Sequence, residues 1–500
     1  MAAAGTIPEL FDAAVAEAGD RIWLRFEGRT FTYAEARRQI GRAAAALAGH
    51  GVGRGDLLLA AMQNTPEHLF TWLASAYTGS IIVTANPRSS AAELAALRRQ
   101  VGPRLTVGAG EPGLGGDALS VAELFAGESV ADGPGPAAPD DAAVLIPTSG
   151  TTGRSKLVTQ THRAYAMAGE GFPWWMELDT DDRLMTSLPL FHINAPAYSM
   201  LGSVAARAGL VLLPRFSASR FIDQARRHGA TEFNAIGAML EILMRQPERP
   251  DDAQNPLRLC YTGPAPSEQR TLEIERRFGL RIVCGYALSE SPYGTIWAHG
   301  TRPYGSLGAI RQHPTLGRVN EGRVVTEDGR PASGGEPGEL QLRNPAVMQG
   351  YWGMPDETAA VLLPDGWLRT GDLVHWNPDR TLTFIGRLKE VIRRRGENVA
   401  PAEIEEALVC QPDVLEAAVV GVPSELSEED IKGFVAVTDP ATADLDAIRS
   451  GAAERLAPFK VPRYLEAVAD LPHTPTGRIA KHRLPRERTA AETDYERTTR

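Results

Sequence analysis

The stretch Thr148-Ser149-Gly150-Thr151-Thr152-Gly153-Arg154-Ser155-Lys156 gathers hydroxyl groups, two glycines and a lysine within nine residues and contains no carboxylate. Hydroxyls donate hydrogen bonds to oxyanions, glycines let backbone N–H groups turn toward a ligand, and lysine adds a mobile positive charge. Such a loop is suited to holding a polyphosphate. The sequence therefore predicts a phosphate-binding loop; a flexible Ser/Thr/Gly-rich connection without a ligand is the alternative.

The segment before this loop indicates the surrounding fold. Val144-Leu145-Ile146 is an apolar run that predicts a buried strand. The loop follows the carboxyl end of that strand, where α/β proteins bind their ligands. The spacing of Gly150, Gly153 and Lys156 differs from that of a Walker loop, in which four residues separate the first glycine from the Gly-Lys pair.

The full string resembles the phosphate loop of the adenylate-forming superfamily, which includes acyl-CoA synthetases, firefly luciferase and the adenylation domains of peptide synthetases. One departure is Ser155, which stands where those proteins usually have proline. The resemblance implies that the loop binds the triphosphate of ATP. The residues it assigns to this role are Thr148, Ser149, Gly150, Thr151, Thr152, Gly153 and Lys156.

Length and composition limit the possible classes of protein. The chain has 500 residues, enough for two or more domains. Its net charge of −10 argues against broad binding of nucleic acid. No apolar stretch approaches the length of a membrane span, and the acidic segment Met1–Asp20 suits an amphipathic helix better than a signal peptide. Cys260, Cys284 and Cys410 lack metal-binding spacing and suggest buried free thiols in a reducing compartment, so we expect a cytoplasmic protein.

The first part of the chain alternates between helical and strand-like patterns. Tyr33–His50 has the apolar spacing of a helix, and Leu57–Ala61 is typical of a strand. A second helix is expected at Pro66–Tyr77 and a second strand at Ile81–Val83. This rhythm predicts a largely parallel sheet covered by helices. Residues 108–140, rich in Gly, Ala, Pro and Asp, suit a surface connection.

From about residue 323 the pattern changes. Short alternating segments around the turn Asn377-Pro378-Asp379-Arg380 predict a small antiparallel β region. A final α/β unit is expected to contain the segments Ala402–Cys410, Ala417–Val422, Gly433–Val437, Asp444–Leu456 and Tyr464–Val468. We therefore expect an α/β fold with a large N-terminal domain (1–386) of parallel α/β subdomains plus the small β region. A small mobile C-terminal α+β domain (390–486) would follow a hinge (387–389), and 487–500 would form a flexible tail.

A second motif, Gly285-Tyr286-Ala287-Leu288-Ser289-Glu290, resembles another signature of the superfamily. By that resemblance Tyr286 packs on adenine, Ser289 donates to the α-phosphate and Glu290 binds Mg²⁺. Ala287 replaces the usual glycine and narrows the approach of the backbone. Taken alone, the motif is better explained as a buried tyrosine beside a surface glutamate, and only its combination with the phosphate loop favours the nucleotide site.

Further motifs imply contacts with the rest of the nucleotide and with CoA. Gly263 and Pro264 resemble the loop that lies against adenine, although a simple turn explains them equally well. Asp372 matches the aspartate that accepts hydrogen bonds from both ribose hydroxyls. Arg387 would also reach the ribose and Lys389 would be the hinge residue. Gly396 would let the pantetheine arm of CoA pass, and the basic run 393–395 is either a solvated loop or a phosphate contact.

Two segments resemble the walls of the acyl pocket. His192, in Phe191-His192-Ile193-Asn194, would line the site of the substrate carboxylate, although a lone histidine is often structural. Asn234–Met239 resembles a second wall, whose small residues imply space.

One departure affects the expected chemistry. Most superfamily members have a lysine near the end of the small domain that bridges carboxylate and phosphate, whereas this chain has Arg478. Arginine is longer, planar and forked, so the exchange is not conservative. Three alternatives follow from this exchange. Arg478 takes over the role of the lysine, Lys481 contacts the reacting groups instead, or the enzyme is poor at adenylating carboxylates and specialised for another step or nucleophile.

The resemblance, together with Val419–Glu425, implies a stand-alone acyl-CoA synthetase of the crotonobetaine/carnitine-CoA ligase-like branch. We expect an AMP-forming acid–CoA ligase that uses ATP, Mg²⁺, CoA and a small-molecule acid. The alternatives are an enzyme limited to the thioester half-reaction, one that activates a non-carboxylate acid such as nitrite for diazotisation, and a non-catalytic nucleotide-binding protein. The acid, the acceptor (CoA, a carrier protein or an amine) and the oligomeric state stay open.

Overall fold

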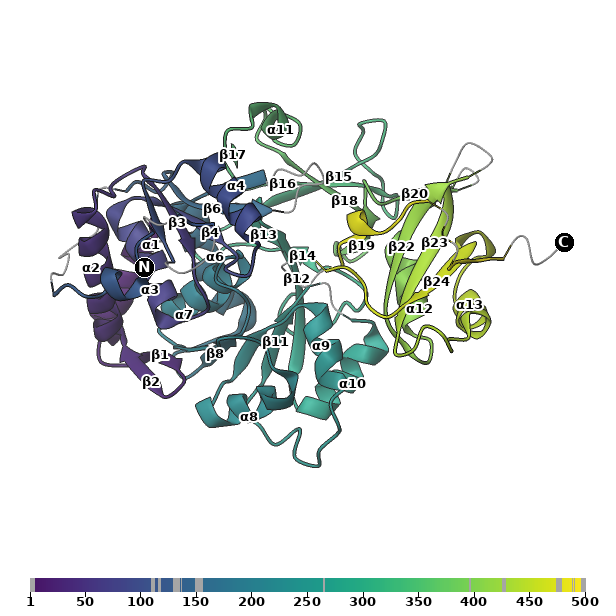
Figure 1. Cartoon of the computed structure of the whole chain (residues 1–500), viewed down its shortest axis with the longest axis horizontal. Helices are drawn as coiled ribbons and strands as arrows, with labels where there is room; N and C mark the ends of the chain where they lie inside the picture. Colours follow the sequence, from purple (N-terminus) through teal and green to yellow (C-terminus); the bar gives the residue numbers. More distant parts are fainter. Residues whose placement is uncertain are drawn as a thin grey trace. The chain divides into compact units, whose positions relative to one another are not determined.

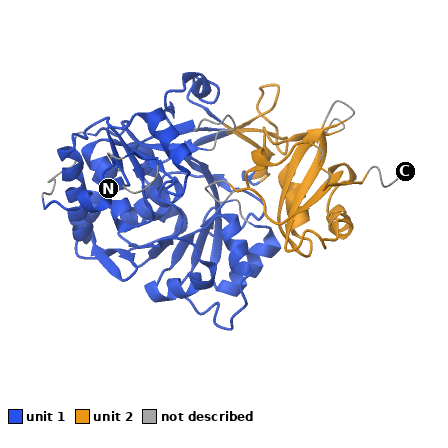
Figure 2. Ribbon diagram, in the orientation of Figure 1, with its two compact units in different colours: residues 1–322, 341–369, 379–382 blue, residues 323–340, 370–378, 383–500 orange. Residues whose placement is uncertain are grey.

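The computed structural model describes residues 5–108, 113–115, 118–128, 135, 137–148, 156–263, 266–394, 397–424, 429–473, 479–487, 489 and 491–495, without the side chains of 397 and 398. The chain divides into two compact units (Figures 1 and 2). Unit 1 comprises Met1–Gly322, Gln341–Arg369 and Asp379–Leu382, and unit 2 comprises Arg323–Leu340, Thr370–Pro378 and Thr383–Arg500. The sequence-based domain boundary at 387–389 stays a prediction.

Unit 1 contains a nine-stranded sheet in which neighbouring strands follow the order β14-β13-β12-β11-β10-β8-β9-β1-β2. The six strands from β12 to β1 run parallel to their neighbours, whereas β13, β14 and β2 are antiparallel additions at the two edges. The strands are β1 (Ile22–Phe26), β2 (Arg29–Thr32), β8 (Arg183–Thr186), β9 (Gly209–Leu212), β10 (Glu232–Asn234), β11 (Leu259–Thr262), β12 (Arg281–Leu288), β13 (Ser291–Ile296) and β14 (Ala309–Ile310).

A second sheet of unit 1 has the order β17-β7-β6-β4-β3-β5. Strands β6, β4, β3 and β5 are parallel, while β7 turns back antiparallel to β6 and β17 pairs antiparallel with β7. Its strands are β3 (Leu57–Ala61), β4 (Ile81–Ala85), β5 (Leu105–Val107), β6 (Ala142–Thr148), β7 (Lys156–Thr161) and β17 (Gly350–Tyr351). The predicted phosphate loop is therefore the connection between two hairpin strands.

Helices connect and cover these strands, as the alternating sequence pattern predicts. Several begin with a capping box, in which a Ser or Thr side chain accepts from the third helical N–H and a glutamate returns to the cap. The helices are α1 (Ile7–Ala18), α2 (Tyr33–Gly49), α3 (Pro66–Thr78), α4 (Ala91–Val101), α5 (Val121–Leu124), α6 (His162–Met176), the π-helix η1 (Ala195–Met200), α7 (Leu201–Ala206), α8 (Ala218–His228), α9 (Gly237–Met244), α10 (Glu268–Phe278) and α11 (Pro355–Ala359).

Unit 2 has its own apolar core, built on the sheet β22-β23-β24-β25. A small sheet, β15-β16-β18-β19, takes its strands from ranges that belong to both units. The remaining elements are β15 (Glu321–Val325), β16 (Gly338–Arg343), β18 (Leu368–Trp376), β19 (Leu382–Arg387), β20 (Ile392–Arg394), β21 (Glu397–Val399), α12 (Pro401–Val409), β22 (Val414–Pro423), β23 (Glu429–Val437), α13 (Leu445–Ala453), η2 (Pro458–Lys460), β24 (Tyr464–Val468), η3 (Lys481–Arg483) and β25 (Thr493–Asp494).

The expected α/β fold class is confirmed: parallel sheets with helices form the large part of the chain, and a smaller α+β part follows. The helices and strands predicted between residues 33 and 83 are all present within a few residues of their expected ends. The stretch 108–140 was expected to be a surface connection, but among its described residues Leu114 and Leu124 are fully buried. Among the described residues, no helix combines the length and the apolar character needed to cross a membrane.

Three details of unit 2 differ from the sequence predictions. Cys410 is exposed, although Cys260 and Cys284 in unit 1 are buried as expected. In the basic run, Arg394 is buried and donates to the carbonyls of Phe459 and Val461, so it is neither a solvated residue nor a phosphate contact.

The described part of 487–495 differs from the flexible tail expected there. Strand β25 pairs with β24. Lys432, whose side chain is 0% exposed, lies 2.6 Å from a carboxylate oxygen of Glu492 and 3.0 Å from one of Glu466. A buried ammonium requires such partners, so this segment completes the core of unit 2.

The core of unit 1 also encloses a buried cation. Arg311, 2% exposed, donates to the carbonyl of Thr295, to that of Tyr286 and to the hydroxyl of Tyr261. Its guanidinium also lies 4.5 Å from the centroid of the Trp175 ring. Within the described residues it makes no ion pair, so carbonyls, hydroxyls and aromatic faces stabilise the charge.

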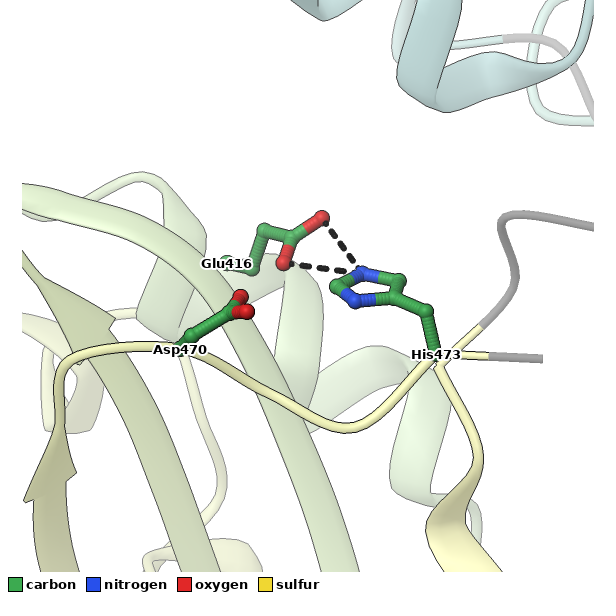
Figure 3. Close-up of side chains that lie close together, drawn as sticks. All are labelled: Glu416, Asp470 and His473. Atoms are coloured by element: carbon green, nitrogen blue, oxygen red, sulfur yellow. Dashed lines mark hydrogen bonds and ion pairs between the residues drawn. The ribbon is translucent and has the colours of Figure 1, made fainter. Parts of the chain in front are cut away.

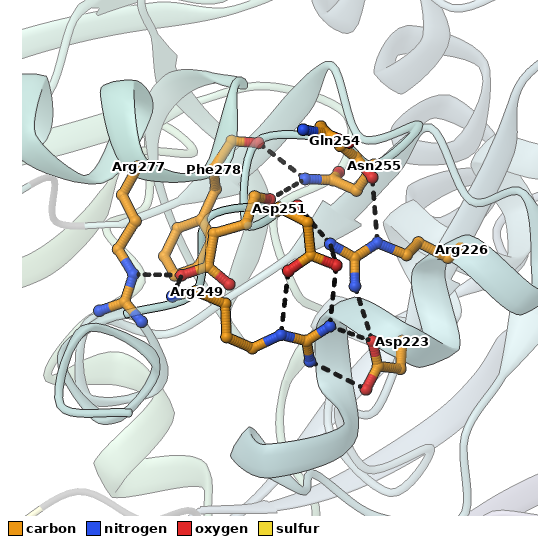
Figure 4. Close-up of polar contacts among 9 residues, drawn as sticks. Asp223, Arg226, Arg249, Asp251, Gln254, Asn255, Arg277 and Phe278 are labelled. Carbon is orange, nitrogen blue, oxygen red and sulfur yellow. Dashed lines mark hydrogen bonds and ion pairs between the residues drawn. The ribbon is translucent and has the colours of Figure 1, made fainter. Parts of the chain in front are cut away.

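A polar network stabilises the loop between α9 and β11 (Figure 4). Arg249 forms ion pairs with Asp223 on α8, at 3.1 Å, and with Asp251, at 3.0 Å. Arg277 on α10 pairs with the buried Asp252 at 2.8 Å. This network ties an irregular loop to two helices and needs no ligand to explain it.

Glu232, on β10, is a buried acid whose carboxyl group, unlike that of Asp252, has no hydrogen-bond partner among the described residues. The residue is 0% exposed. Burial, with a smaller contribution from the Asp182 carboxylate, raises its pKa well above the usual value of 4.5. Above pH 4.5, the protonated form of Glu232 is therefore more favoured in the folded chain than in the unfolded chain.

This raised pKa predicts how stability depends on pH. Between pH 4.5 and the raised pKa, the folded chain holds one proton more than the unfolded chain, so the free energy of unfolding falls by about 1.4 kcal/mol per pH unit. Glu232→Gln removes this loss; we expect the variant to gain stability over the wild type as pH rises from 4.5 to the raised pKa, and the difference to stay constant above it. Thermal unfolding across this range measures the difference, with the exposed Glu248→Gln as control. A difference that does not vary with pH would contradict the assignment.

Candidate nucleotide-binding site

The predicted phosphate loop is anchored at both ends by the hairpin of β6 and β7. Thr148 pairs with Lys156 across the two strands, and the Thr148 hydroxyl donates to the Lys156 carbonyl at 3.2 Å. The residues between them, which include the predicted ligands Ser149, Gly150, Thr151, Thr152 and Gly153, lie outside the described residues. The hairpin thus fixes where the loop starts and ends.

Lys156 and Glu290 are brought together by a residue between them. Tyr351 on β17 donates its hydroxyl to Oε1 of Glu290 at 2.9 Å. The Nζ atom of Lys156 lies 4.6 Å from the centroid of the same ring. Lys156 and Glu290, predicted from motifs 134 positions apart, therefore contact the ring and the hydroxyl of the same tyrosine.

The backbone of Ser289 and Glu290 is also held in place. Gln160 on β7, fully buried, donates its amide to the Ser289 carbonyl at 2.7 Å. The Met348 N–H donates to the Glu290 carbonyl at 2.8 Å. The turn that carries Ser289 and Glu290 is therefore fixed from the second sheet and from the segment before β17.

The predicted adenine segment lies at the end of two adjacent parallel strands. A Cβ atom at Gly263, directly after β11, would lie 2.1 Å from the Gly285 carbonyl oxygen, so only glycine fits. Tyr286 and Ala287 follow on β12, and both are partly exposed. Pro264 lies outside the described residues. This close approach places Gly263 beside the start of the Tyr286 segment.

The predicted acyl-pocket residues contact each other in part. The ring of His192 packs edge-on against Phe191, with centroids 4.6 Å apart. Asn234, buried at the end of β10, donates its amide to Oδ1 of Asn194 at 2.7 Å. Oδ1 of Asn234 has no hydrogen-bond partner among the described residues. A buried carbonyl oxygen without a donor is typical of a site that a ligand or water completes.

In unit 2, the two residues predicted to bind ribose form an ion pair. Nε of Arg387 lies 2.8 Å from Oδ1 of Asp372, and the Asp372 side chain is 1% exposed. The Asp372 N–H donates to the hydroxyl of Thr370. The arginine therefore orients a carboxylate whose position is already fixed by β18.

Lys481, also in unit 2, lies between two carboxylates. Its Nζ is 2.8 Å from Oε1 of Glu405 and 3.0 Å from Oε2 of Glu390. Burial alone would lower the pKa of Lys481, but the carboxylates of Glu405 and Glu390 outweigh it and raise the pKa. Glu390 directly follows the predicted hinge residue Lys389, which is exposed. Arg478 and Gly396 lie outside the described residues.

The predicted magnesium ligand, Glu290, is a single carboxylate. Mg²⁺ commonly takes one or two protein carboxylates and completes its shell with phosphate oxygens and water, so Glu290 fits this role. Within the described residues, one group of three has the spacing of a metal site: Glu416, Asp470 and His473 in unit 2 (Figure 3). The contact of Glu416 with His473, at 3.1 Å, is sufficient to explain why these two partly exposed side chains lie together.

Two residues of the site were missed from the sequence. Gln160 lies on β7, where Lys156, Thr159 and Thr161 are also polar, so the composition of this strand carries no signal that could have found it. Tyr351 follows Gly350, whose φ of +143° favours glycine, but such a pair also occurs in ordinary turns.

Solved structures with the same fold have bound nucleotides. ATP-bound MatB from Rhodopseudomonas palustris matches with a TM-score of 0.85 and 26% identity, over 94% of this chain and 97% of that one. O-succinylbenzoate coenzyme A synthetase (MenE) from Bacillus subtilis, in complex with AMP, matches with a TM-score of 0.83 and 26% identity, over 95% and 98%.

Curated relatives match along nearly the full length. The crotonobetaine/carnitine–CoA ligase of Salmonella enteritidis PT4 is 31% identical over 95% of this chain and 98% of its own. That of Salmonella paratyphi A is 32% identical over 93% and 96%. The family model of AMP-binding enzymes matches residues 11–352, and that of the AMP-binding enzyme C-terminal domain matches residues 403–478. This chain therefore belongs to the family of AMP-binding enzymes.

Proposed function

We propose that this protein is an AMP-forming acid–CoA ligase that activates a small organic acid with ATP and transfers it to CoA. The observation that carries the proposal is the full-length similarity to crotonobetaine/carnitine–CoA ligases. The contacts among Lys156, Tyr351 and Glu290 support it, because they bring groups suited to phosphate and to a metal ion close together.

The proposed reaction has two steps. A carboxylate oxygen of the acid attacks the α-phosphorus of ATP, the bond to the bridging oxygen breaks, and acyl-AMP and pyrophosphate form. The thiol sulfur of CoA then attacks the acyl carbon, losing its proton, and AMP leaves with the electron pair of the broken acyl–oxygen bond. The protein contributes positioning and charge stabilisation rather than covalent chemistry.

The proposal assigns a task to each of the following site residues. Lys156 attracts the phosphates, Ser289 donates to the α-phosphate, and Glu290 holds Mg²⁺, which would neutralise phosphate charge when bound. Tyr286 and Gly263 border the adenine, and Asp372 accepts from the ribose hydroxyls while Arg387 orients it.

His192 and the Asn194–Asn234 pair would border the acid. The two alternative activities, the thioester half-reaction and activation of nitrite, depended on Arg478. Because Arg478 lies outside the described residues, no described contact favours either of them.

The first test is to measure AMP and pyrophosphate release with ATP, Mg²⁺, CoA and a panel of aliphatic, betaine-like and aromatic acids. We expect AMP release that requires both an acid and CoA, with formation of the corresponding thioester. A folded chain that binds ATP but releases no AMP with any acid would contradict the proposal.

The second test concerns the ribose contact. Asp372→Asn removes the negative charge that would accept from the ribose hydroxyls and leaves Arg387 without its ion-pair partner, so ATP affinity should fall about tenfold to hundredfold. Calorimetric titration with ATP measures this effect.

Asp379→Asn, in the turn between β18 and β19, is the matched control. Asp379 uses one carboxylate oxygen to accept from the N–H and hydroxyl of Thr381, and asparagine retains an oxygen there. Equal ATP affinities for the two variants would refute the assignment of Asp372.

A further inference from the structure

Tyr351 touches both charged residues of the site in unit 1 and has no role in the motifs read from the sequence. It is 9% exposed, and its backbone is fixed by pairing with Val158 on β7 and by the hydroxyl of Thr358, which accepts from its N–H at 2.9 Å. Its side chain is therefore presented from a rigid position. Its hydroxyl contacts Glu290, and its ring contacts Lys156.

Lys156 and Glu290 have opposite charges and share a neighbour, yet they make no ion pair with each other or with any other described residue. A direct ion pair would engage the ammonium and the carboxylate with each other. Tyr351 instead offers a hydroxyl donor to the carboxylate and a π-face to the ammonium. Both interactions are weaker than an ion pair with phosphate or a metal ion, so a ligand can replace or share them.

We propose that Tyr351 is a positioning residue that holds Glu290 through its hydroxyl and Lys156 through its ring, and so keeps the two charges apart and available for Mg²⁺ and phosphate. This inference rests on the proposed function, because it assumes that the site binds ATP with Mg²⁺. It extends that function by assigning the ordering of the metal ligand to a residue outside the predicted motifs. Partners that orient a metal ligand typically contribute about tenfold or more to metal affinity.

The two contacts can be separated by substitution. Tyr351→Phe removes the hydroxyl and keeps the ring, so the carboxylate loses its donor while the ammonium keeps its π-face. We expect the affinity for ATP with Mg²⁺ to fall about tenfold, and the affinity for ATP alone in excess chelator to change less than about twofold. Tyr351→Leu removes both contacts, so the affinity for ATP alone should also fall.

The control is Tyr293→Phe. Tyr293 is a fully buried tyrosine of unit 1 whose hydroxyl has no hydrogen-bond partner among the described residues. Removing that hydroxyl should leave both affinities at the wild-type value. Calorimetric titration with ATP, with and without Mg²⁺, gives the readout without requiring turnover, and thermal unfolding checks that each variant is folded.

A double-mutant cycle separates positioning from a structural effect. If Tyr351 acts through Glu290, Tyr351→Phe should have no further effect on Mg²⁺-dependent affinity in the Glu290→Gln background. Three outcomes would each overturn the inference: equal loss of both affinities in Tyr351→Phe, an unchanged Mg²⁺-dependent affinity in that variant, or additive effects in the cycle. In each of these cases, ATP binding by the wild type would leave the proposed function intact. A folded wild-type chain that binds neither form of ATP would overturn both.

Discussion

The larger unit depends on the burial of one guanidinium group. Arg311 follows β14, and its donors reach the carbonyl of Thr295 on β13, the carbonyl of Tyr286 on β12 and the hydroxyl of Tyr261 on β11. A buried charge without a carboxylate is stable only if every surrounding acceptor is in place. Arg311 thereby couples three neighbouring strands, and the strand that carries Tyr286 is one of them.

Long-range contacts also hold the rest of the site in unit 1. Glu290 and Ser289 lie in the turn between β12 and β13, whose strands pair at Leu288 and Ser291, and contacts from outside this hairpin constrain the turn further. Gln160 and Met348, from distant parts of the chain, supply that constraint by bonding to the two carbonyls. Close contact between Gly263 and Gly285 then sets the spacing of the adjacent strand ends. The site is thus shaped by long-range contacts to main-chain atoms.

This explains which features could be predicted from the sequence. The helices and strands between residues 33 and 83 follow from local periodicity, and the family signatures point to Lys156, Glu290 and Asp372. Tyr351 and Gln160 could not be assigned in this way, because their importance arises only when β17 and β7 pair and bring them beside Glu290. The partners of Lys481, and the burial of Arg394 and Glu492, likewise depend on folding of unit 2, which a run of charged residues does not indicate.

The buried Lys432 has a consequence for how the chain matures. One of its two carboxylates, Glu466, lies on β24, but the other, Glu492, follows 60 positions after the lysine. Because domains generally fold as units during synthesis, the core of unit 2 cannot neutralise this ammonium fully until the ribosome has released Glu492. A nascent chain held on the ribosome before that point would carry a finished larger unit beside a smaller one that is still incompletely folded.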